Sequence, residues 1–235
     1  MKLDVLVISS HPDDAELSCA GTILSLTSVG KKVGIVDLTK GELGTRGDVE
    51  TRMHEAAEAS KVLGLSIRGN MGFPDGFFEN TKEYILELVK IIRVYQPDIV
   101  LANALNDRHP DHAMGASLAS RACFLSGLRK IETGQEPWRP TRVYHYVQDR
   151  LVIPSFVVDI TPYWENKWKA IQCYKSQFHN AAASPHEPET YISTPLYGEY
   201  IRARAIELGH SIGVMYGEGF VHATPIGIKN ILDLI

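Results

Sequence analysis

The chain has 235 residues, of which 44% are hydrophobic and 22% are charged, and its formal net charge at pH 7 is −4. This composition is ordinary for a folded globular protein and excludes disorder as the main state, while the length suits a single domain over residues 1–235. The mild acidity argues against nucleic acid or an anionic membrane as the main partner, and no apolar run approaches the ~20 residues that a membrane span requires.

The first half of the chain alternates short apolar runs with segments of helical periodicity. The apolar runs predict strands at residues 3–8, 33–38, 65–69 and 99–102. Apolar side chains at helical spacing predict helices at residues 17–30, 51–63, 83–95 and 113–128. Strands that alternate with helices in this way indicate a mostly parallel sheet with helices on both faces, so we expect an open, doubly wound α/β fold.

The second half of the chain is less regular. Strands are predicted at residues 143–147 and 156–160, and helices at residues 164–174 and 200–212. Between these two helices, residues 178–195 are rich in Ala, Ser, Pro, His and Glu. Irregular segments of this length often form lids or binding loops, so we expect an irregular C-terminal elaboration of the same domain.

Two similar tetrapeptides follow two of the predicted strands. His11-Pro12-Asp13-Asp14 follows the first strand, and His109-Pro110-Asp111-His112 follows the fourth. In each, the proline biases the preceding histidine towards an extended conformation, which places the imidazole at the carboxyl end of its strand. In a doubly wound sheet with the order 3-2-1-4, these two strand ends are neighbours at the topological switch point, where ligands bind. We therefore expect the two motifs to form one site.

The residue types in the two motifs favour a metal site. His11, Asp14 and His112 offer two nitrogens and one oxygen, a set that suits catalytic zinc with one position left open for water. A metal in such a site lowers the pKa of bound water to ~7 and polarises a carbonyl oxygen. One Zn²⁺ per chain is therefore the predicted cofactor.

The remaining polar residues of the motifs supply proton transfer. Asp13 adjoins a predicted ligand and could take the proton of the water and later return it to the leaving group. His109 could stabilise the oxyanion or act as an acid, with Asp111 orienting it. These parts suit hydrolysis of an amide.

Simpler interpretations compete with this one. Asp13 with Glu16 three residues later is a helix-capping pattern, and histidines in loops need have no ligand role. A sugar-binding protein without catalytic activity and a two-metal phosphoesterase are alternatives, although only one convincing ligand set is present. A nucleotide site is disfavoured, because carboxylates stand where a phosphate-binding loop has glycines.

Three further features lie after predicted strands. Residues 41–47 contain three glycines, and they either reach over the crevice or serve as a flexible connector. Arg52 could offer its guanidinium to a substrate carboxylate, although a surface arginine is the commoner outcome. Residues 73–76 are typical of a turn first and of a pocket wall second.

The cysteines and the N-terminal segment indicate where in the cell the protein is expected. Cys19, Cys123 and Cys173 are widely spaced in apolar surroundings, so they predict neither a disulfide framework nor a CxxC ligand pair. The N-terminal apolar stretch is too short for a secretory signal. A cytoplasmic location is expected.

Several of these residues resemble the PIG-L/LmbE-like family of zinc-dependent N-acetylglucosamine deacetylases. The similarity covers nearly the whole chain, and the paired HPDD and HPDH motifs are its most specific part. It extends to Gly41–Gly47, to Arg108 before the second motif, and to Ile212–Glu218. The segments 37–47 and 174–178 most resemble the bacillithiol-pathway branch of the family, which removes acetyl from N-acetylglucosaminyl malate.

The resemblance implies zinc on His11, Asp14 and His112, with Asp13 as general base and His109 as assisting acid or oxyanion partner. It further implies that Arg52, and also Arg108, meet the carboxylate of the substrate. It implies a Rossmann-like fold and a homo-oligomer, a trimer or a hexamer. The predicted activity is thus deacetylation of an amino-sugar conjugate, N-acetylglucosaminyl malate first, with a mycothiol-type precursor or a chitooligosaccharide as the alternative.

Overall fold

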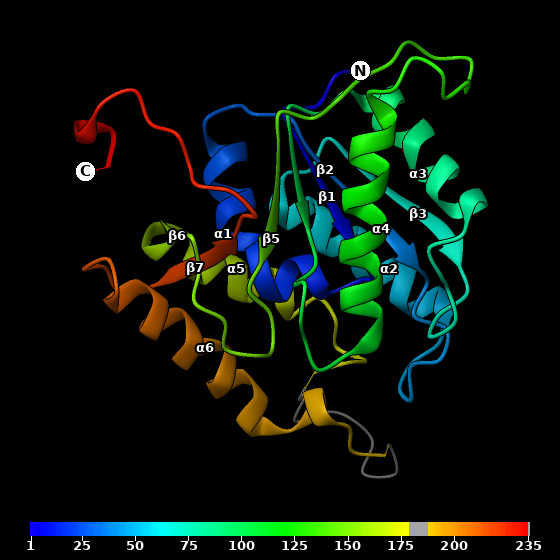
Figure 1. Cartoon of the computed structure of the whole chain (residues 1–235). Coiled ribbons are helices and arrows are strands. Elements are labelled where there is room, and N and C mark those ends of the chain that lie inside the picture. The colour runs from blue at the N-terminus through cyan, green and yellow to red at the C-terminus, as the bar shows by residue number, and fades with distance from the viewer. Residues whose placement is uncertain (179–187, 235) are drawn as a thin grey trace.

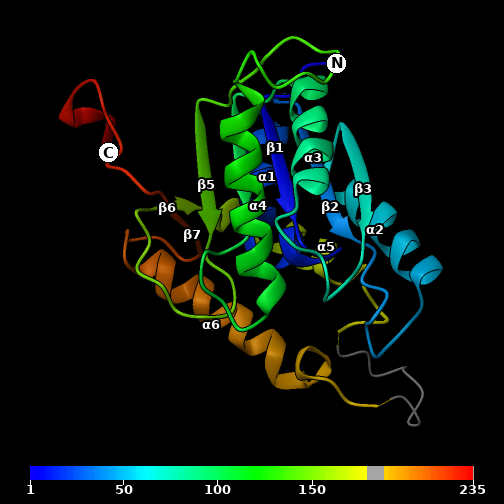
Figure 2. The same ribbon diagram turned by 45° about the vertical axis from the view of Figure 1, so that its right-hand side comes forward.

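The computed structural model describes residues 1–178 and 188–234. Within these ranges, one sheet has the strand order β3-β2-β1-β4-β5-β7-β6 (Figures 1 and 2). The strands are β1 (Val5–Ser9), β2 (Val33–Thr39), β3 (Ile67–Phe73), β4 (Ile99–Ala102), β5 (Arg142–Tyr146), β6 (Phe156–Asp159) and β7 (Gly217–Val221). The first five strands in chain order are parallel, while β7 runs antiparallel to both β5 and β6. The predicted fold class and the order 3-2-1-4 are confirmed.

Helices cover both faces of the sheet. They are α1 (Asp14–Ser28), α2 (Val49–Leu63), α3 (Lys82–Tyr95), α4 (Pro110–Ser126), α5 (Trp164–Ile171) and α6 (Pro195–His210), with short 3-10 turns at Thr161–Tyr163, Tyr191–Ser193 and Ile231–Leu234. Helices α3 and α4 lie together on one face, and α1, α2 and α5 lie on the other (Figure 2). Helix α6 passes below the carboxyl ends of the strands (Figure 1).

Strand β1 shows why the sequence forms a two-sided sheet. All five of its residues are buried. Val5 and Val7 pack into the hydrophobic cluster beneath α1, whereas Leu6 and Ile8 pack into the cluster beneath α3 and α4. Because successive strand side chains point to opposite faces, a continuous apolar run is what a strand covered on both sides requires.

The structure differs from the sequence prediction mainly in the last third of the chain. Strand β7 is not predicted, because its sequence Gly-Glu-Gly-Phe-Val has weak strand propensity, yet it pairs with a strand on each side. Helix α6 begins at Pro195 rather than at residue 200, since proline is favoured in the first turn of a helix. Of the predicted irregular segment 178–195, residues 179–187 lie outside the described residues.

Two neighbouring strand ends bring the predicted motifs together. Ile8 in β1 is paired with Ala102 in β4, so the two strands end side by side. The loop after β1 leads into α1, and the loop after β4 leads into α4 (Figure 2). The two motifs therefore face the same crevice, as the strand order predicted.

No helix in the described part of the chain is both long enough and apolar enough to cross a membrane.

The cysteines give a test of the packing. Cys19 and Cys123 are buried in the two main clusters, and burial raises the pKa of Cys123 to about 12. Cys173 is only partly buried. Because thiolates are the reactive form, we expect one thiol to react with Ellman's reagent in the native protein and all three after unfolding. The variant Cys173→Ser should remove the native reaction, and rapid native reaction of that variant would contradict this packing.

Candidate active site

A pocket of about 380 Å³ opens at the carboxyl ends of the strands. The loops after β1, β2, β3, β4 and β5 all contribute to its walls, and Tyr191 and Arg204 close it from the C-terminal part of the chain. Both sequence motifs line this pocket. It therefore occupies the switch point of the sheet, where an open α/β fold binds its ligands.

The first motif makes an unusual turn between β1 and α1. Asp13 has a φ of 113°, which lies in the left-handed region, where a residue other than glycine costs about 1–3 kcal/mol and is held only by surrounding contacts. Asp13 occupies the N-cap position of α1, but its side chain makes no capping hydrogen bond. The capping interpretation of this carboxylate is therefore wrong. Asp14 begins the helix, and its Oδ2 accepts a hydrogen bond of 2.9 Å from the backbone N–H of His11.

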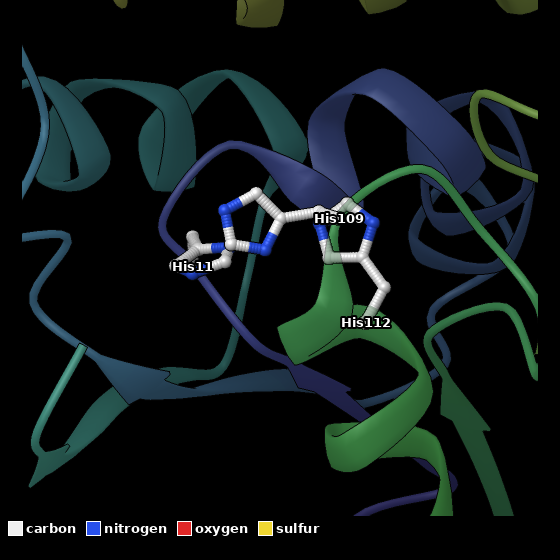
Figure 3. Close-up of side chains that lie close together, drawn as sticks. All are labelled: His11, His109 and His112. Carbon is white, nitrogen blue, oxygen red and sulfur yellow. The ribbon is translucent and has the colours of Figure 1, made fainter. Parts of the chain in front are cut away.

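The second motif begins α4. Pro110 stands in the first turn, and His109 is the N-cap residue, with its Nδ1 accepting a 3.3 Å hydrogen bond from the backbone N–H of Asp111. Figure 3 shows the rings of His11, His109 and His112 gathered between the loop after β1 and the start of α4. The ring of His11 lies 4.6 Å from that of His109 and 5.6 Å from that of His112, measured between centroids.

Each predicted histidine ligand has one ring nitrogen held by a carboxylate. The Nε2 of His11 lies 3.0 Å from Asp75 Oδ1 and 3.1 Å from Asp111 Oδ2. The Nδ1 of His112 contacts Asp107 Oδ2. Carboxylates in such positions fix the tautomer and the orientation of histidines that bind metals.

The opposite ring nitrogens face Asp14. The Nδ1 of His11 lies 3.6 Å from Asp14 Oδ2, and the Nε2 of His112 lies 3.0 Å from Asp14 Oδ1. Asn103 and Gln148 donate hydrogen bonds to the same carboxylate. The carboxylate of Asp14 thus lies beside one nitrogen of each imidazole, and donors of these types are ones that borderline-soft divalent metals accept.

The site could therefore hold a metal ion. Among the described residues, His11, His109 and His112 bring one ligand atom each within 4.8 Å of one another, and so do His11, Asp75 and Asp111. The predicted ligand Asp14 is in neither of these groups, although its carboxylate lies 3.6 Å from His11 Nδ1 and 3.0 Å from His112 Nε2. Because a ring nitrogen must be unprotonated to bind a metal, binding here would release protons from the cluster.

Burial and neighbouring charges shift the pKa values of the site in different directions. Burial raises the pKa of Asp13 above its ordinary value, and the charge of Asp14 acts in the same direction. Burial also opposes ionisation of Asp14, but the charges and hydrogen bonds of His112 and His11 hold its pKa well below its usual range. Burial lowers the pKa of His109, as do the charges of His11 and His112.

Of the remaining predicted residues, Arg52 and Arg108 line the pocket and Asp111 is not among its lining residues, and all three have partners of their own. The carboxylate of Asp111 contacts His11 and accepts from the backbone N–H of Gly76, so only its backbone N–H reaches His109. Arg52 is buried against Asp13. Arg108 is half exposed at the rim, where it stacks on Tyr191 and lies 3.4 Å from Asp149.

Sequence reasoning did not identify Asp75 and Asp107 as partners of the histidines, although it offered residues 73–76 as a pocket wall. Asp75 falls in the turn predicted at residues 73–76, and its Oδ2 accepts a 3.0 Å hydrogen bond from the backbone of Leu43 in the loop 41–47. That loop therefore reaches the pocket. Asp107 comes two residues before the second motif, and its Oδ1 accepts from two backbone N–H groups after β5. Carboxylates that directly precede or follow a turn give no signal of which histidine they will hold.

The fold and the site together define a class of protein. The switch point of this doubly wound α/β domain holds imidazoles that lie together, a carboxylate that faces two of them, and a second carboxylate next to it in the sequence. Such a site is typical of a metal-dependent hydrolase. Comparison with known proteins identifies the family within that class. The family model described as GlcNAc-PI de-N-acetylase, PIG-L, matches residues 6–123.

Individual relatives agree with this match. Diacetylchitobiose deacetylase from Thermococcus kodakarensis is 30% identical over 94% of this chain and 86% of its own length. The probable N-acetyl-alpha-D-glucosaminyl L-malate deacetylase 2 of Bacillus anthracis is 28% identical over 74% of this chain and 81% of its own length. The crystal structure of a conserved protein from Thermus thermophilus has 38% identity and a TM-score of 0.88, covering 97% of this chain and 98% of that chain. The chain belongs to the PIG-L family of deacetylases, which confirms the predicted enzyme class.

Proposed function

We propose that this protein is a zinc-dependent hydrolase that removes the acetyl group from N-acetylglucosaminyl malate. One observation carries the proposal: the carboxylate of Asp14 faces one nitrogen of His11 and one of His112, while Asp13 and His109 line the same pocket. A ligand set with a separate carboxylate and a separate imidazole beside it is what metal-assisted amide hydrolysis requires.

We assign the zinc to His11, Asp14 and His112. His11 would bind through Nδ1 and His112 through Nε2, because their other nitrogens contact Asp111 and Asp107. When bound there, a divalent cation acts as a Lewis acid towards the acetyl carbonyl and lowers the pKa of water to ~7.

The residues beside the ligands would move the protons. Asp13 accepts the proton of the water that attacks the acetyl carbon, and it gives this proton to the sugar nitrogen as the C–N bond breaks. His109 accepts a backbone hydrogen bond at Nδ1, so the neutral ring carries its proton on Nε2. That N–H can donate to the carbonyl oxygen as it gains negative charge.

The substrate proposal rests on two supports. The amino-sugar part is supported by the family, described as GlcNAc-PI de-N-acetylase, and by two relatives that are named as deacetylases of diacetylchitobiose and of N-acetyl-alpha-D-glucosaminyl L-malate. The malate part follows from the resemblance of segments 37–47 and 174–178 to the bacillithiol-pathway branch, and from the Bacillus anthracis relative. A chitooligosaccharide is the second candidate, because the diacetylchitobiose deacetylase covers more of this chain. We further propose that the enzyme is cytoplasmic and forms a trimer or hexamer.

A free-amine assay tests the activity and the substrate together. We expect purified protein to release amine from N-acetylglucosaminyl malate faster than from diacetylchitobiose, to lose activity after chelation, and to regain it with one equivalent of zinc. Faster release of amine from diacetylchitobiose would make a chitooligosaccharide, the second candidate, the proposed substrate. No amine from either conjugate, with zinc bound, would reject a deacetylase function.

Asp107 gives a test of the histidine assignment. In Asp107→Asn, the amide cannot accept both from His112 and from the backbone N–H groups after β5, so one of these contacts becomes repulsive. We expect zinc affinity to fall by about 10- to 100-fold, as is usual when the partner of a metal-binding histidine is changed. Competition with a chelator measures it. Asp149→Asn is the matched control, since Asp149 contacts rim residues instead, and an equal loss of affinity there would contradict the assignment.

A further inference from the structure

Arg52 lies where it can act on the turn that carries Asp13. It belongs to the first turn of α2, and only 7% of its surface is exposed. Its Nε and Nη2 donate to the carbonyl oxygen of Pro12 at 3.2 and 3.0 Å, and Nη2 also lies 2.9 Å from Asp13 Oδ2. One guanidinium thus holds the backbone before Asp13 and the carboxylate of Asp13.

These contacts coincide with the strained point of the chain. Asp13 is one of two described residues other than glycine with a positive φ, and its side chain does not cap α1. Among the described residues, Arg52 makes the one hydrogen bond to the Asp13 carboxylate. A backbone conformation of this kind persists only where neighbouring groups fix it, and Arg52 is the group that contacts both parts of the turn.

The loop after β2 packs against the guanidinium of Arg52. A Cβ added to Gly41 would lie 3.3 Å from the Arg52 Cζ, and one added to Gly44 would lie 3.3 Å from its Nη1. The backbone of this loop therefore lies close to the guanidinium, which also lines the pocket.

We infer that Arg52 is a positioning residue for Asp13: its guanidinium fixes the Pro12–Asp13 turn so that the carboxylate faces the reacting water. The inference rests on the proposed function, in which Asp13 is the general base. It differs from the role that the family resemblance implies for Arg52, which is contact with the carboxylate of the substrate. The planar fork reaches the Pro12 carbonyl with two nitrogens and the carboxylate with one of them, so lysine, which has a single nitrogen, is not equivalent here.

Kinetics on two substrates separate the two roles. With Arg52→Ala, we expect kcat to fall by about 100-fold on both N-acetylglucosaminyl malate and diacetylchitobiose, because small displacements of a catalytic group have effects of this size. KM should change little, and Arg52→Lys should restore only part of kcat. Added guanidinium ion should raise kcat of Arg52→Ala and not that of Asp13→Asn. Arg121→Ala, which removes an exposed arginine of α4, is the matched control for charge.

If Arg52 binds the substrate instead, the same experiments give different results. A rise in KM confined to the malate substrate, with kcat retained, would show that Arg52 binds the substrate carboxylate and would overturn the inference. A crystal structure of Arg52→Ala tests the inference without any activity: we expect the Asp13 carboxylate to turn away and its φ to leave the left-handed region. An unchanged turn would overturn the inference. An inactive wild-type enzyme would reject the proposed function alone, and the structure of the variant would still decide the role of Arg52.

Discussion

Asp13→Asn is expected to keep its zinc and to lose turnover by about 100- to 10,000-fold, the range that general-base catalysis usually contributes. Asparagine has nearly the same shape, and its Oδ1 can still accept the hydrogen bond from Arg52, so the turn should be retained. What the amide lacks is a basic oxygen that can accept the proton of water. Metal content per chain and kcat, measured on the same preparation, test both halves of this expectation.

This result would distinguish the role of Asp13 from that of Asp14. The two carboxylates have different partners, since Asp13 contacts Arg52 and Asp14 contacts His11 and His112. Asp13→Asn with normal turnover would exclude Asp13 as the base. Loss of zinc in this variant would place Asp13 among the ligands instead.

Asp14→Ala is expected to lose both zinc and activity. The substitution removes a carboxylate that faces both imidazoles, and it leaves two histidine nitrogens of the proposed set to hold the ion. After dialysis, we expect metal content close to zero, with turnover lost in proportion, whereas Asp13→Asn treated alongside should retain about one zinc per chain.

Asp14 also has a structural role, which the experiment must take into account. Its carboxylate accepts hydrogen bonds from Asn103, Gln148 and the backbone of His11. Asp14→Asn preserves the volume and one acceptor oxygen, so it serves as the milder variant, and circular dichroism establishes that each variant is folded. Retention of zinc by folded Asp14→Ala would remove Asp14 from the ligand set.

The sequence predicted the sheet well because its signals are local. A continuous apolar run such as β1 satisfies a strand that is buried on both faces, and this pattern does not depend on other parts of the chain. Strand β7 is the opposite case, because Gly217 and Gly219 weaken its own propensity and pairing on both sides compensates. The predicted start of α6 is also too late. Pro195 indicates the start of a helix only when the end of the preceding segment is known, and the sequence alone does not show that end.

The site was predictable to the extent that it depends on the order of the strands. His11 and His112 are about a hundred residues apart, yet a proline fixes each motif at a strand end and the topology places those ends together. The partners of each side chain were not predictable. Asp111 was expected to orient His109 and instead places its carboxylate on His11, and Asp75 arrives from a turn after a different strand.

The amino-acid sequence by itself determined the α/β architecture, the meeting of the two motifs and the residue types available for metal binding and proton transfer. Periodicity and the restriction that proline imposes act over a few residues, so they can be recognised along the chain. Only the tertiary structure decided which carboxylate holds which imidazole, and that Arg52 is directed at Asp13. Hydrogen bonds depend on distances of a few tenths of an ångström between side chains from different elements, and those distances exist only after the whole sheet and its helices have packed.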